Sequence, residues 1–529
     1  MTGQNPALRL AALPILVLYG VHYLVNGPGV EPDPVELPPP VKMEKAPEPK
    51  PVLSKPVKAR ATSASCADTA LLGHELGELI REATVSSQSA EHHLPPESAA
   101  AMKRAHAALE RMFPAVHRAS RREVVADFSL LYRFPGLDMT LKPVLLLCHL
   151  DVSPVEPGTE ALWTHPPFSG HVDDTFVWGR GAIDMKNTCA MMMHALESLL
   201  TRATPLTLQR AVYLAIGHDE EVGGAMGAKS LVALLSERGV VPELVLDEGS
   251  GLVEGGVYPL IHRSVAFVST AEKGYMSVQL TTNASGGGHS SRPKLQGTPI
   301  TVLSEALGRL QSNQFPVSIQ PPMTDFLDAW ADQLMTMQPM RAFAKVWRWW
   351  KPLVEYVMGR DPQLNFFVRT TTAVTMINAG VKENVIPGTA SAIINHRLMP
   401  TTTNTSVLQH YERTIDNPEI SINPTNAMPN GWMPASKVAP VDTQGYRAIV
   451  GSIKAVFGKD MPVLPFLLMA GADARHYVEL AEGRVYRFSP TWLGPNEMSL
   501  MHGTDERIPL ESLGNMCHFF SAFLESMCA

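Results

Sequence analysis

The chain has 529 residues, of which 45% are hydrophobic and 18% are charged, and its formal net charge is -7. This length exceeds what one hydrophobic core supports, so two or three domains are expected. The acidic balance, without a basic stripe, argues against a nucleic-acid partner. The five cysteines are an odd number without a C-x-x-C pair. Neither a disulfide framework nor a thiolate metal site is therefore expected, although one bridge stays open.

An apolar run at the N-terminus indicates where in the cell the protein is found. Residues 10–25 are nearly all apolar, Arg9 precedes them, and three acidic residues follow by position 36. The run is longer than a signal-peptide core and shorter than a standard spanning helix, and its flanking charges favour a cytoplasmic N-terminus. We expect residues 1–26 to be a signal anchor or a signal peptide, with a plain helix as the alternative. The protein would then follow the secretory pathway and be secreted or membrane-anchored, at the cell surface or in a vacuole-like or lysosome-like compartment.

The next segment differs in composition from everything that follows. Residues 27–62 are rich in Pro, Glu and Lys and lack aromatic residues, which predicts an extended, disordered stalk. From 63 to 268, short continuous apolar runs alternate with amphipathic stretches, a pattern typical of a buried, mainly parallel sheet. Strands are expected at 143–148, 211–216 and 243–246, and helices at 98–112, 190–200 and 229–238.

The middle of the chain, residues 269–430, predicts a smaller α+β domain. Its elements follow the order β-α-β-β-α-β. Residues 315–369 interrupt this order with added helices whose Trp and Met side chains form either helix core or an apolar substrate pocket. The α/β pattern returns over residues 431–529. The predicted fold is an α/β catalytic domain with a mainly parallel sheet, built from 63–268 and 431–529, into which the α+β domain is inserted. The expected strands of that domain are 276–282, 372–377, 390–398 and 419–423, and its helices are 298–310 and 405–415.

Residues that can carry chemistry follow the predicted strands. His149 and Asp151 come directly after the first apolar run, and a His-Asp-Glu-Glu sequence, 218–221, follows the second. Asp247 follows the third, and Asp184 lies in a glycine-rich turn before a helix. Because ligands of parallel α/β sheets bind beyond the carboxyl ends of the strands, we expect these side chains to converge.

Imidazole and carboxylate groups without thiolates indicate a metal site, and zinc suits them. Two such metals need a bridging carboxylate, acidify a shared water and polarise a carbonyl group. A neighbouring carboxylate that binds no metal can then accept the proton. Each residue alone has a plainer interpretation, such as a structural hydrogen bond or a helix cap. Their common placement after strands favours the binuclear site.

Eight segments resemble the zinc exopeptidase and aminoacylase family, metallopeptidase family M-20, and especially carboxypeptidase S and its N-acyl-amino-acid hydrolase relatives. The segments occur in the family's order from about residue 70 to the C-terminus. They are HLDV at 149–152, WTHPPF at 163–168, GRGAIDMK at 179–186, HDEEVGG at 218–224, DEG at 247–249, GHSSRP at 288–293, NVIP at 384–387 and MHGTDE at 501–506.

The resemblance implies two zinc ions per chain and a role for each site residue. Glu220 would be the general base and acid. Asp151 would orient the metal ligand His149 without binding the metal itself. Asp184 would bridge the metals, and its peptide bond to Met185 would be cis. The five implied ligands are His149, Asp184, Glu221, Asp247 and His502.

The inserted domain resembles the family's lid. His289 would reach the oxyanion, in some relatives from a second subunit, and Arg397 would bind the substrate carboxylate, with Asn384 nearby. Arg475 lies in a turn beside the site, where a structural role and a substrate contact are both open. The insertion at 315–369 is longer than the lid of the dimeric aminoacylases, so the oligomeric state stays open.

These roles predict a hydrolase that cleaves an amide bond next to a free carboxylate. A carboxypeptidase that acts on short peptides is the first expectation, and an N-acyl-amino-acid amidohydrolase is the alternative. A binding protein that kept the fold without catalysis is a third, disfavoured by the intact Glu220 and ligand set.

Overall fold

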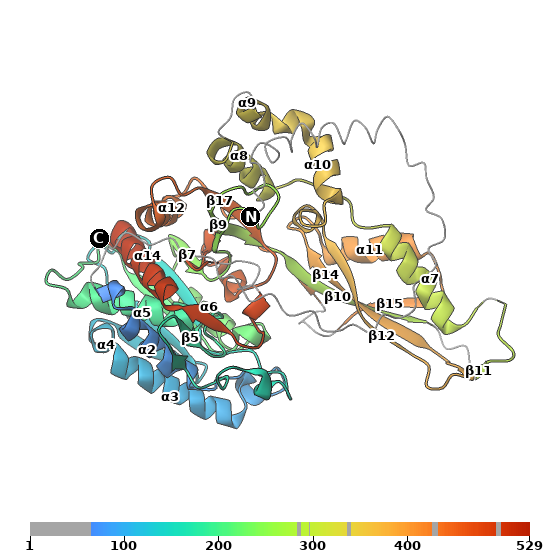
Figure 1. Cartoon of the computed structure of the whole chain (residues 1–529), viewed down its shortest axis with the longest axis horizontal. Helices are drawn as coiled ribbons and strands as arrows, with labels where there is room; N and C mark the ends of the chain where they lie inside the picture. The colour runs from blue at the N-terminus through green and yellow to red at the C-terminus, as the bar shows by residue number, and fades with distance from the viewer. Residues whose placement is uncertain (1–64, 283–286, 296, 336–339, 426–431, 493–498) are drawn as a thin grey trace, which may run out of the picture.

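The computed structural model describes residues 65–282, 287–295, 297–335, 340–425, 432–492 and 499–529. Within these ranges it forms two bodies joined at a narrow crossing (Figure 1). No helix in these ranges is long and apolar enough to cross a membrane. The expected signal segment and stalk lie outside them.

The larger body is built on a nine-stranded sheet, with strand order β1-β2-β6-β3-β7-β18-β9-β17 and β8 paired with β9. The pairings β6-β3, β3-β7, β7-β18 and β9-β17 are parallel, and β18-β9 is antiparallel. The α/β fold class with a mainly parallel sheet is therefore confirmed. The strands are β1 Arg121–Val125, β2 Ser129–Phe134, β3 Val144–His149, β6 Val212–Gly217, β7 Leu244–Asp247, β8 Leu252–Val253, β9 Val265–Glu272, β17 Val463–Leu468 and β18 Val485–Arg487.

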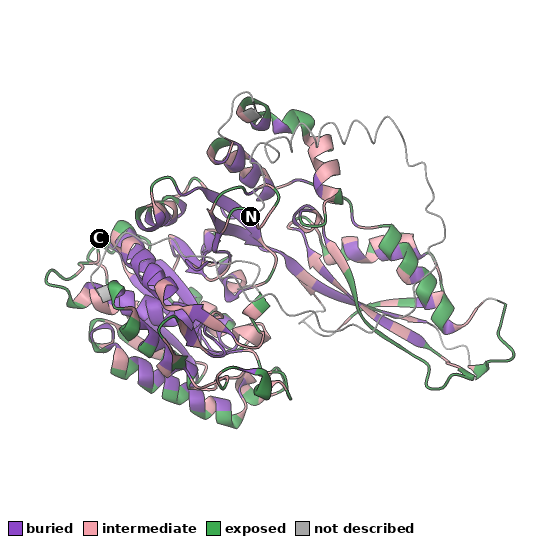
Figure 2. Ribbon diagram, viewed as in Figure 1, coloured by how far each residue is buried: buried purple, intermediate pink, exposed green. Residues whose placement is uncertain are grey.

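Helices cover both faces of this sheet and exclude water from it (Figure 2). One layer packs α14 against α2, α5 and α12, and α6 lies on the other face. β17, β18 and α14 come from the last seventy residues of the chain, so the sheet and its core need both segments. The helices are α2 Thr69–Ile80, α3 Pro96–Met112, α4 Pro114–Ala119, α5 Lys186–Thr201, α6 Ala228–Glu237, α12 Gln444–Phe457 and α14 Leu510–Cys528.

Two cysteine pairs correct the expectation of at most one bridge. Cys66 is bonded to Cys517 and ties the first described residues to α14, and Cys148 is bonded to Cys189 between β3 and α5. The partners lie 451 and 41 residues apart in sequence, so spacing carried no sign of the pairing. Cys528 is free and buried.

The smaller body is an antiparallel sheet, called the lid sheet here, with strand order β12-β14-β10-β15 and β16 paired with β10. Helices α7 and α11 pack on it. β10 follows β9 after Lys273 alone, so the chain passes directly from the main sheet into the lid sheet at this residue. A Cβ at Gly274 would lie 2.5 Å from backbone atoms of Met433 and Ala435, which explains the glycine there. The elements are β10 Gly274–Thr282, α7 Pro299–Ser312, β12 Thr371–Ala379, β14 Ala390–Leu398, α11 Asn404–Ile415, β15 Ile420–Pro424 and β16 Trp432–Met433.

The inserted helices pack on the main sheet and not on the lid core. α8 contacts β17, and a shared core joins Phe326, Trp330 and Trp347 to Phe466. These three aromatic residues therefore belong to the core of the inserted helices, which was the first of the two alternatives. Trp349 differs, because 84% of its surface is exposed. The elements are α8 Met323–Gln333, α9 Met340–Lys345, η6 Trp347–Trp350 and α10 Lys351–Arg360.

Candidate active site

The site lies where three parallel strands end. The pairing register sets His149 of β3 beside Gly217 of β6, and Leu146 of β3 beside Leu246 of β7. The residues that follow each strand therefore meet at the same edge of the sheet, as expected from the apolar runs. β4 (His171–Val172), β5 (Phe176–Trp178) and β19 (Arg507–Pro509) form a small separate sheet, and the loop that carries Asp184 follows β5.

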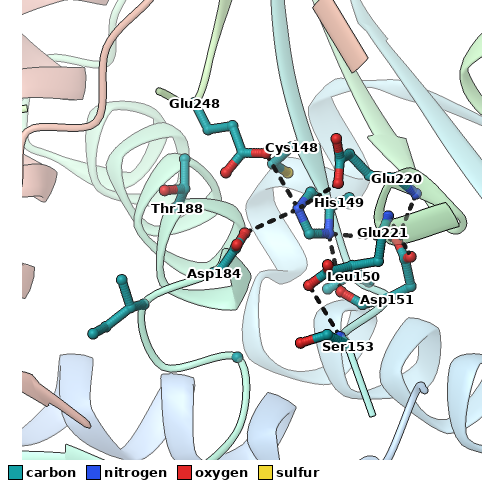
Figure 3. A network of polar contacts seen from close by, with 12 residues as sticks. Cys148, His149, Leu150, Asp151, Ser153, Asp184, Thr188, Glu220, Glu221 and Glu248 are labelled. Carbon is teal, nitrogen blue, oxygen red and sulfur yellow. Dashed lines mark hydrogen bonds and ion pairs between the residues drawn. The ribbon is translucent and has the colours of Figure 1, made fainter. Parts of the chain in front are cut away.

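One group of metal-ligating side chains centres on His149 (Figure 3). Its Nε2 lies 3.3 Å from Asp184 Oδ1 and 3.4 Å from Glu248 Oε1. The Nδ1 side of the same ring faces the Asp151 backbone oxygen at 2.9 Å and the Asp151 carboxylate at 3.4 Å. The ring therefore offers Nε2 to the two carboxylates while Asp151 holds its other side.

A second group shares Asp184. His502 Nε2 lies 3.0 Å from Asp184 Oδ2 and 3.2 Å from Glu221 Oε2. One carboxylate thus directs one oxygen to each group, as a bridging ligand does. His149 Nε2 and Asp184 Oδ1 are buried and have no hydrogen-bond partner among the described residues. Buried polar atoms without partners fit a pair of metal ligands.

The carboxylates hold protons on both imidazoles when no metal is bound. Burial disfavours the charged form of His149, but the nearby carboxylates of Asp151, Asp184 and Glu248 outweigh it and keep its pKa well above the ordinary value. Hydrogen bonds with Asp184 and Glu221 raise the pKa of His502 to about 10. Because an imidazole must lose its proton to bind a metal, the apparent metal affinity falls as the pH falls.

Asp151 also fixes the position of the two adjacent glutamates. Its Oδ1 accepts the backbone N–H of Glu220 and its Oδ2 accepts that of Glu221, both at 3.1 Å. Glu221 then faces His502, whereas Glu220 Oε2 lies 4.0 Å from His149 Nε2. Burial raises the pKa of Glu220 well above its ordinary value, and the charges of Glu248 and Asp473 add to the effect. Glu220 belongs to neither ligand group, as a proton carrier requires.

At the end of β7 the structure differs from the expected ligand set. Glu248, and not Asp247, joins His149 and Asp184. Asp247 turns away, with Oδ1 accepting the N–H of Glu248 at 2.8 Å and Oδ2 that of Ala474 at 2.7 Å. Adjacent residues at a strand end face opposite sides, so only one of the two acids can reach the site. Glu248 could have been considered from the sequence, because it is a second acid directly after Asp247 at the same strand end.

A buried ion pair between Arg180 and Glu506 supports the shared ligand. Glu506 Oε1 accepts the backbone N–H groups of Gly181 and Ile183 in the loop of Asp184. Its Oε2 lies 2.5 Å from the Arg180 guanidinium, which also donates to the backbone oxygen of His502. This pair ties the loops that carry Asp184 and His502 to each other.

Arg475 and Arg397 lie on the lid side of the site. Arg475 Nη2 is 3.4 Å from Glu220 Oε1, and Arg475 Nε is 3.7 Å from Glu272 at the crossing to the lid sheet. Arg397 is half-buried with its guanidinium 5.1 Å from the Tyr275 ring centre. Burial lowers the pKa of Arg397, and the nearby charge of Arg475 lowers it further.

The structure does not bring two expected substrate residues to this site. His289 is exposed on β11 (Gly288–His289), which pairs with β13 (Val385–Ile386) next to Asn384, itself exposed. β11 lies at the outer tip of the lid, far from the strand ends of the main sheet (Figure 1). The peptide bond between Asp184 and Met185 is cis, as the resemblance implied.

Two candidate ligand groups share one carboxylate, and the Glu220 carboxylate lies beside them outside both groups, an arrangement typical of binuclear metallohydrolases. A model of peptidase family M20/M25/M40 matches residues 145–526. The chain therefore belongs to this peptidase family.

Individual relatives agree with the family. The chain is 33% identical to the probable carboxypeptidase S-like 2 of Dictyostelium discoideum over 416 residues, 78% of this chain and 77% of that protein. It is 36% identical to the N-fatty-acyl-amino acid synthase/hydrolase PM20D1 of Mus musculus over 423 residues, 79% and 81% of the two chains. The M20 family metallo-carboxypeptidase Sso-CP2 of Sulfolobus solfataricus has the same fold, with a TM-score of 0.60 at 17% identity over 86% of this chain and 98% of that one.

These relations confirm the expected family and the assignment of the chain as an M20 hydrolase of the carboxypeptidase or N-acyl-amino-acid hydrolase type. The five ligand positions, the base and the substrate residues are taken up below as proposals.

Proposed function

We propose that this chain is a two-zinc hydrolase that cleaves an amide bond next to a free carboxylate. The observation that carries the proposal is Asp184, whose two oxygens face two different imidazoles while Glu220 stays outside both groups. The proposed ligands are His149, Asp184, Glu221, Glu248 and His502.

The donor set suits zinc because it combines two imidazoles with three carboxylates and contains no thiolate. When bound, the two metals would lower the pKa of a water molecule and polarise the scissile carbonyl group. The protein contributes positioning. Asp151 and the Arg180–Glu506 pair hold the ligands in place through buried hydrogen bonds, so the geometry exists before the substrate arrives.

Glu220 is the proposed proton carrier. Its raised pKa suits a group that accepts a proton from the attacking water and returns it to the leaving nitrogen. Arg475, 3.4 Å away, favours the charged form of Glu220 at the start of this cycle. Two effects therefore act in opposite directions on the pKa of Glu220. Burial favours the protonated form, and the positive charge of Arg475 favours the ionised form.

Arg397 is the proposed partner of the substrate carboxylate. Its guanidinium stacks on Tyr275 and has no carboxylate partner among the described side chains. A planar guanidinium of this kind binds a carboxylate through two parallel hydrogen bonds. The released product is then an amino acid with a free carboxylate.

Two substrate classes share this chemistry. Release of a C-terminal amino acid from a short peptide is the first candidate, in agreement with the carboxypeptidase S-like relative. Hydrolysis of an N-acyl amino acid is the second, and it is favoured by the 36% identity to the N-fatty-acyl-amino acid synthase/hydrolase of mouse. Both substrates present an amide nitrogen one carbon away from a carboxylate.

Paired assays on the zinc-loaded protein test the proposal. An N-blocked dipeptide and a long-chain N-acyl amino acid are each compared with the same compound carrying a C-terminal amide. We expect hydrolysis of at least one acid and little of either amide, because the amide forms no ion pair with Arg397. Equal turnover of acid and amide, or no turnover of any of the four, would contradict the proposal. The preferred acid identifies the substrate class.

β11, which carries His289, lies at the outer tip of the lid away from its own site, and the lid sheet offers a surface for a second molecule. β12 is an edge strand, and Val374, Met376 and Ile377 on it are 48%, 53% and 57% exposed. None of them belongs to the lid core. A long exposed edge with apolar side chains favours pairing with another chain. We propose that a second copy pairs along β12 and places its His289 at the site.

Two inactive variants test this arrangement. His289→Ala lacks the group supplied to the neighbour, and Glu220→Gln lacks the base. In a mixed dimer one site combines an intact Glu220 with a partner's intact His289. Co-expression should therefore restore about a quarter of the wild-type activity at statistical mixing of subunits. Activity no greater than the sum of the separate variants would show that His289 does not act across subunits.

Location belongs to the proposal as well. Two cysteine pairs suit a protein that folds in an oxidising compartment, which agrees with the secretory route expected from the N-terminal sequence. We propose a secreted or membrane-anchored enzyme, with residues 1–26 as the signal or anchor.

A further inference from the structure

Outside the two ligand groups, a third cluster of metal-ligating side chains lies on the small sheet beside the site. It consists of His165, His171 and Asp173. His171 begins β4 and Asp173 follows that strand, so the two are i and i+2 neighbours on one face, and His165 comes from the preceding loop. We propose that these three residues form a third divalent-metal site, separate from the hydrolytic centre.

The three side chains are already gathered. One ligand atom from each lies within 4.8 Å of the other two. The imidazole rings of His165 and His171 are stacked with their centres 3.8 Å apart and their planes at 22°. Neither ring makes a hydrogen bond to another described residue in this structure. His171 is exposed and His165 half-buried, so an ion can reach the cluster from solvent.

Asp173 is held ready for such an ion. Its Oδ1 accepts the backbone N–H groups of Thr175 and Phe176, each at 2.7 Å. Its Oδ2 accepts the indole N–H of Trp178 at 2.7 Å and keeps one lone pair. Metal-binding carboxylates are oriented by hydrogen bonds of this kind, so Oδ2 is the ligand atom we assign.

The donor set identifies the class of ion and its exchangeability. Two imidazoles and one carboxylate suit Zn²⁺, Ni²⁺ or Cu²⁺ better than Mg²⁺ or Ca²⁺. Three protein ligands at the surface leave positions for water. The Arg507 guanidinium, 4.7 Å from the Trp178 ring centre, is a nearby positive charge that weakens the binding of a cation. The ion should therefore exchange more readily than those of the buried centre.

An ion here would brace a segment that contacts the hydrolytic centre. Thr164, next to His165, donates its backbone N–H and its hydroxyl to Asp505, three residues after His502. A link between His165 and β4 would thus hold the loop of His502 from the outer side. We expect the third ion to raise the thermal stability of the protein.

Zinc titration of the full chain with its hydrolytic centre already filled tests the site. We expect calorimetry and equilibrium dialysis to show one further equivalent of zinc. In His171→Asn and His165→Asn the affinity for that equivalent should fall roughly tenfold or more. His262→Asn, which removes another exposed histidine, should keep it. His171→Asn should also lose the stabilisation by added zinc while it retains wild-type turnover at zinc levels that fill only the buried pair.

The proposal is overturned if the filled protein binds no further zinc, or if both histidine variants bind it as the wild type does. Neither result depends on the substrate of the enzyme, so a failure here is distinguishable from a failure of the proposed hydrolysis.

Discussion

Replacing Glu220 with Gln is expected to lower kcat by about 10²- to 10⁴-fold while the protein keeps both metals. Glutamine has nearly the same shape but cannot accept the proton of the attacking water or return it to the leaving nitrogen. Glu220 lies in neither ligand group, and its backbone N–H is held by Asp151 whichever side chain is present. The measurement is single-turnover hydrolysis together with metal analysis of the same sample.

Glu237→Gln is the matched control for this variant, because Glu237 is an exposed glutamate at the end of α6. It should leave kcat and metal content unchanged. Retention of near-normal turnover in Glu220→Gln would refute the role of Glu220 as the proton carrier. Loss of a metal ion from it would instead identify Glu220 as a ligand.

Replacing Glu248 with Gln is expected to remove one of the two metals and nearly all activity. Glu248 Oε1 faces His149 Nε2 at 3.4 Å, and an amide is a much weaker zinc ligand than a carboxylate. Metal content per chain, measured after dialysis against a chelator-buffered zinc solution, should fall from two ions to one.

Asp247→Asn is the comparison that decides between the adjacent acids. Both carboxylate oxygens of Asp247 accept backbone N–H groups, and asparagine has only one oxygen to accept them, so one of these hydrogen bonds is lost. The cost should appear as about 1–3 kcal/mol in the free energy of unfolding, with both metals retained. The opposite pattern, with one metal lost from Asp247→Asn and none from Glu248→Gln, would restore Asp247 as the ligand.

Most of the fold and the location of the site follow from local sequence patterns. The apolar runs before His149, Gly217 and Asp247 became buried strands within a residue or two of the expected ends. Parallel neighbours bring their carboxyl ends to one edge, so predicting the strands also placed His149, Glu220 and Glu221 together, whereas Asp247, expected with them, turns away. The spacing of ligands along the sequence was less informative than their position after strands.

The remaining features depend on three-dimensional packing. Whether Asp247 or Glu248 faces the site depends on the direction in which each side chain points at the end of β7. Two adjacent acids in the sequence do not indicate that direction. The pair of Arg180 and Glu506 joins segments more than three hundred residues apart. The cysteine pairs likewise join distant segments, and the exposed edge of β12 emerges only once its neighbours are known.

His289 shows the limit of a motif most clearly. The motif predicted that a histidine of the lid reaches the oxyanion, but the structure places β11, which carries His289, at the tip of the lid away from its own site. The proposed pairing along β12 would give this histidine a role in a second copy. Sequence similarity transfers the identity of a side chain, whereas the molecule that uses it depends on assembly.

The most direct test of the central claim is a crystal structure of the zinc-loaded Glu220→Gln protein with anomalous diffraction measured at both sides of the zinc edge. Two anomalous peaks per chain are predicted at the hydrolytic centre, each about 2.0–2.2 Å from an oxygen of Asp184. One should also contact His149 and Glu248, and the other Glu221 and His502. A single peak there, or a peak coordinated by Asp247 in place of Glu248, would contradict the account.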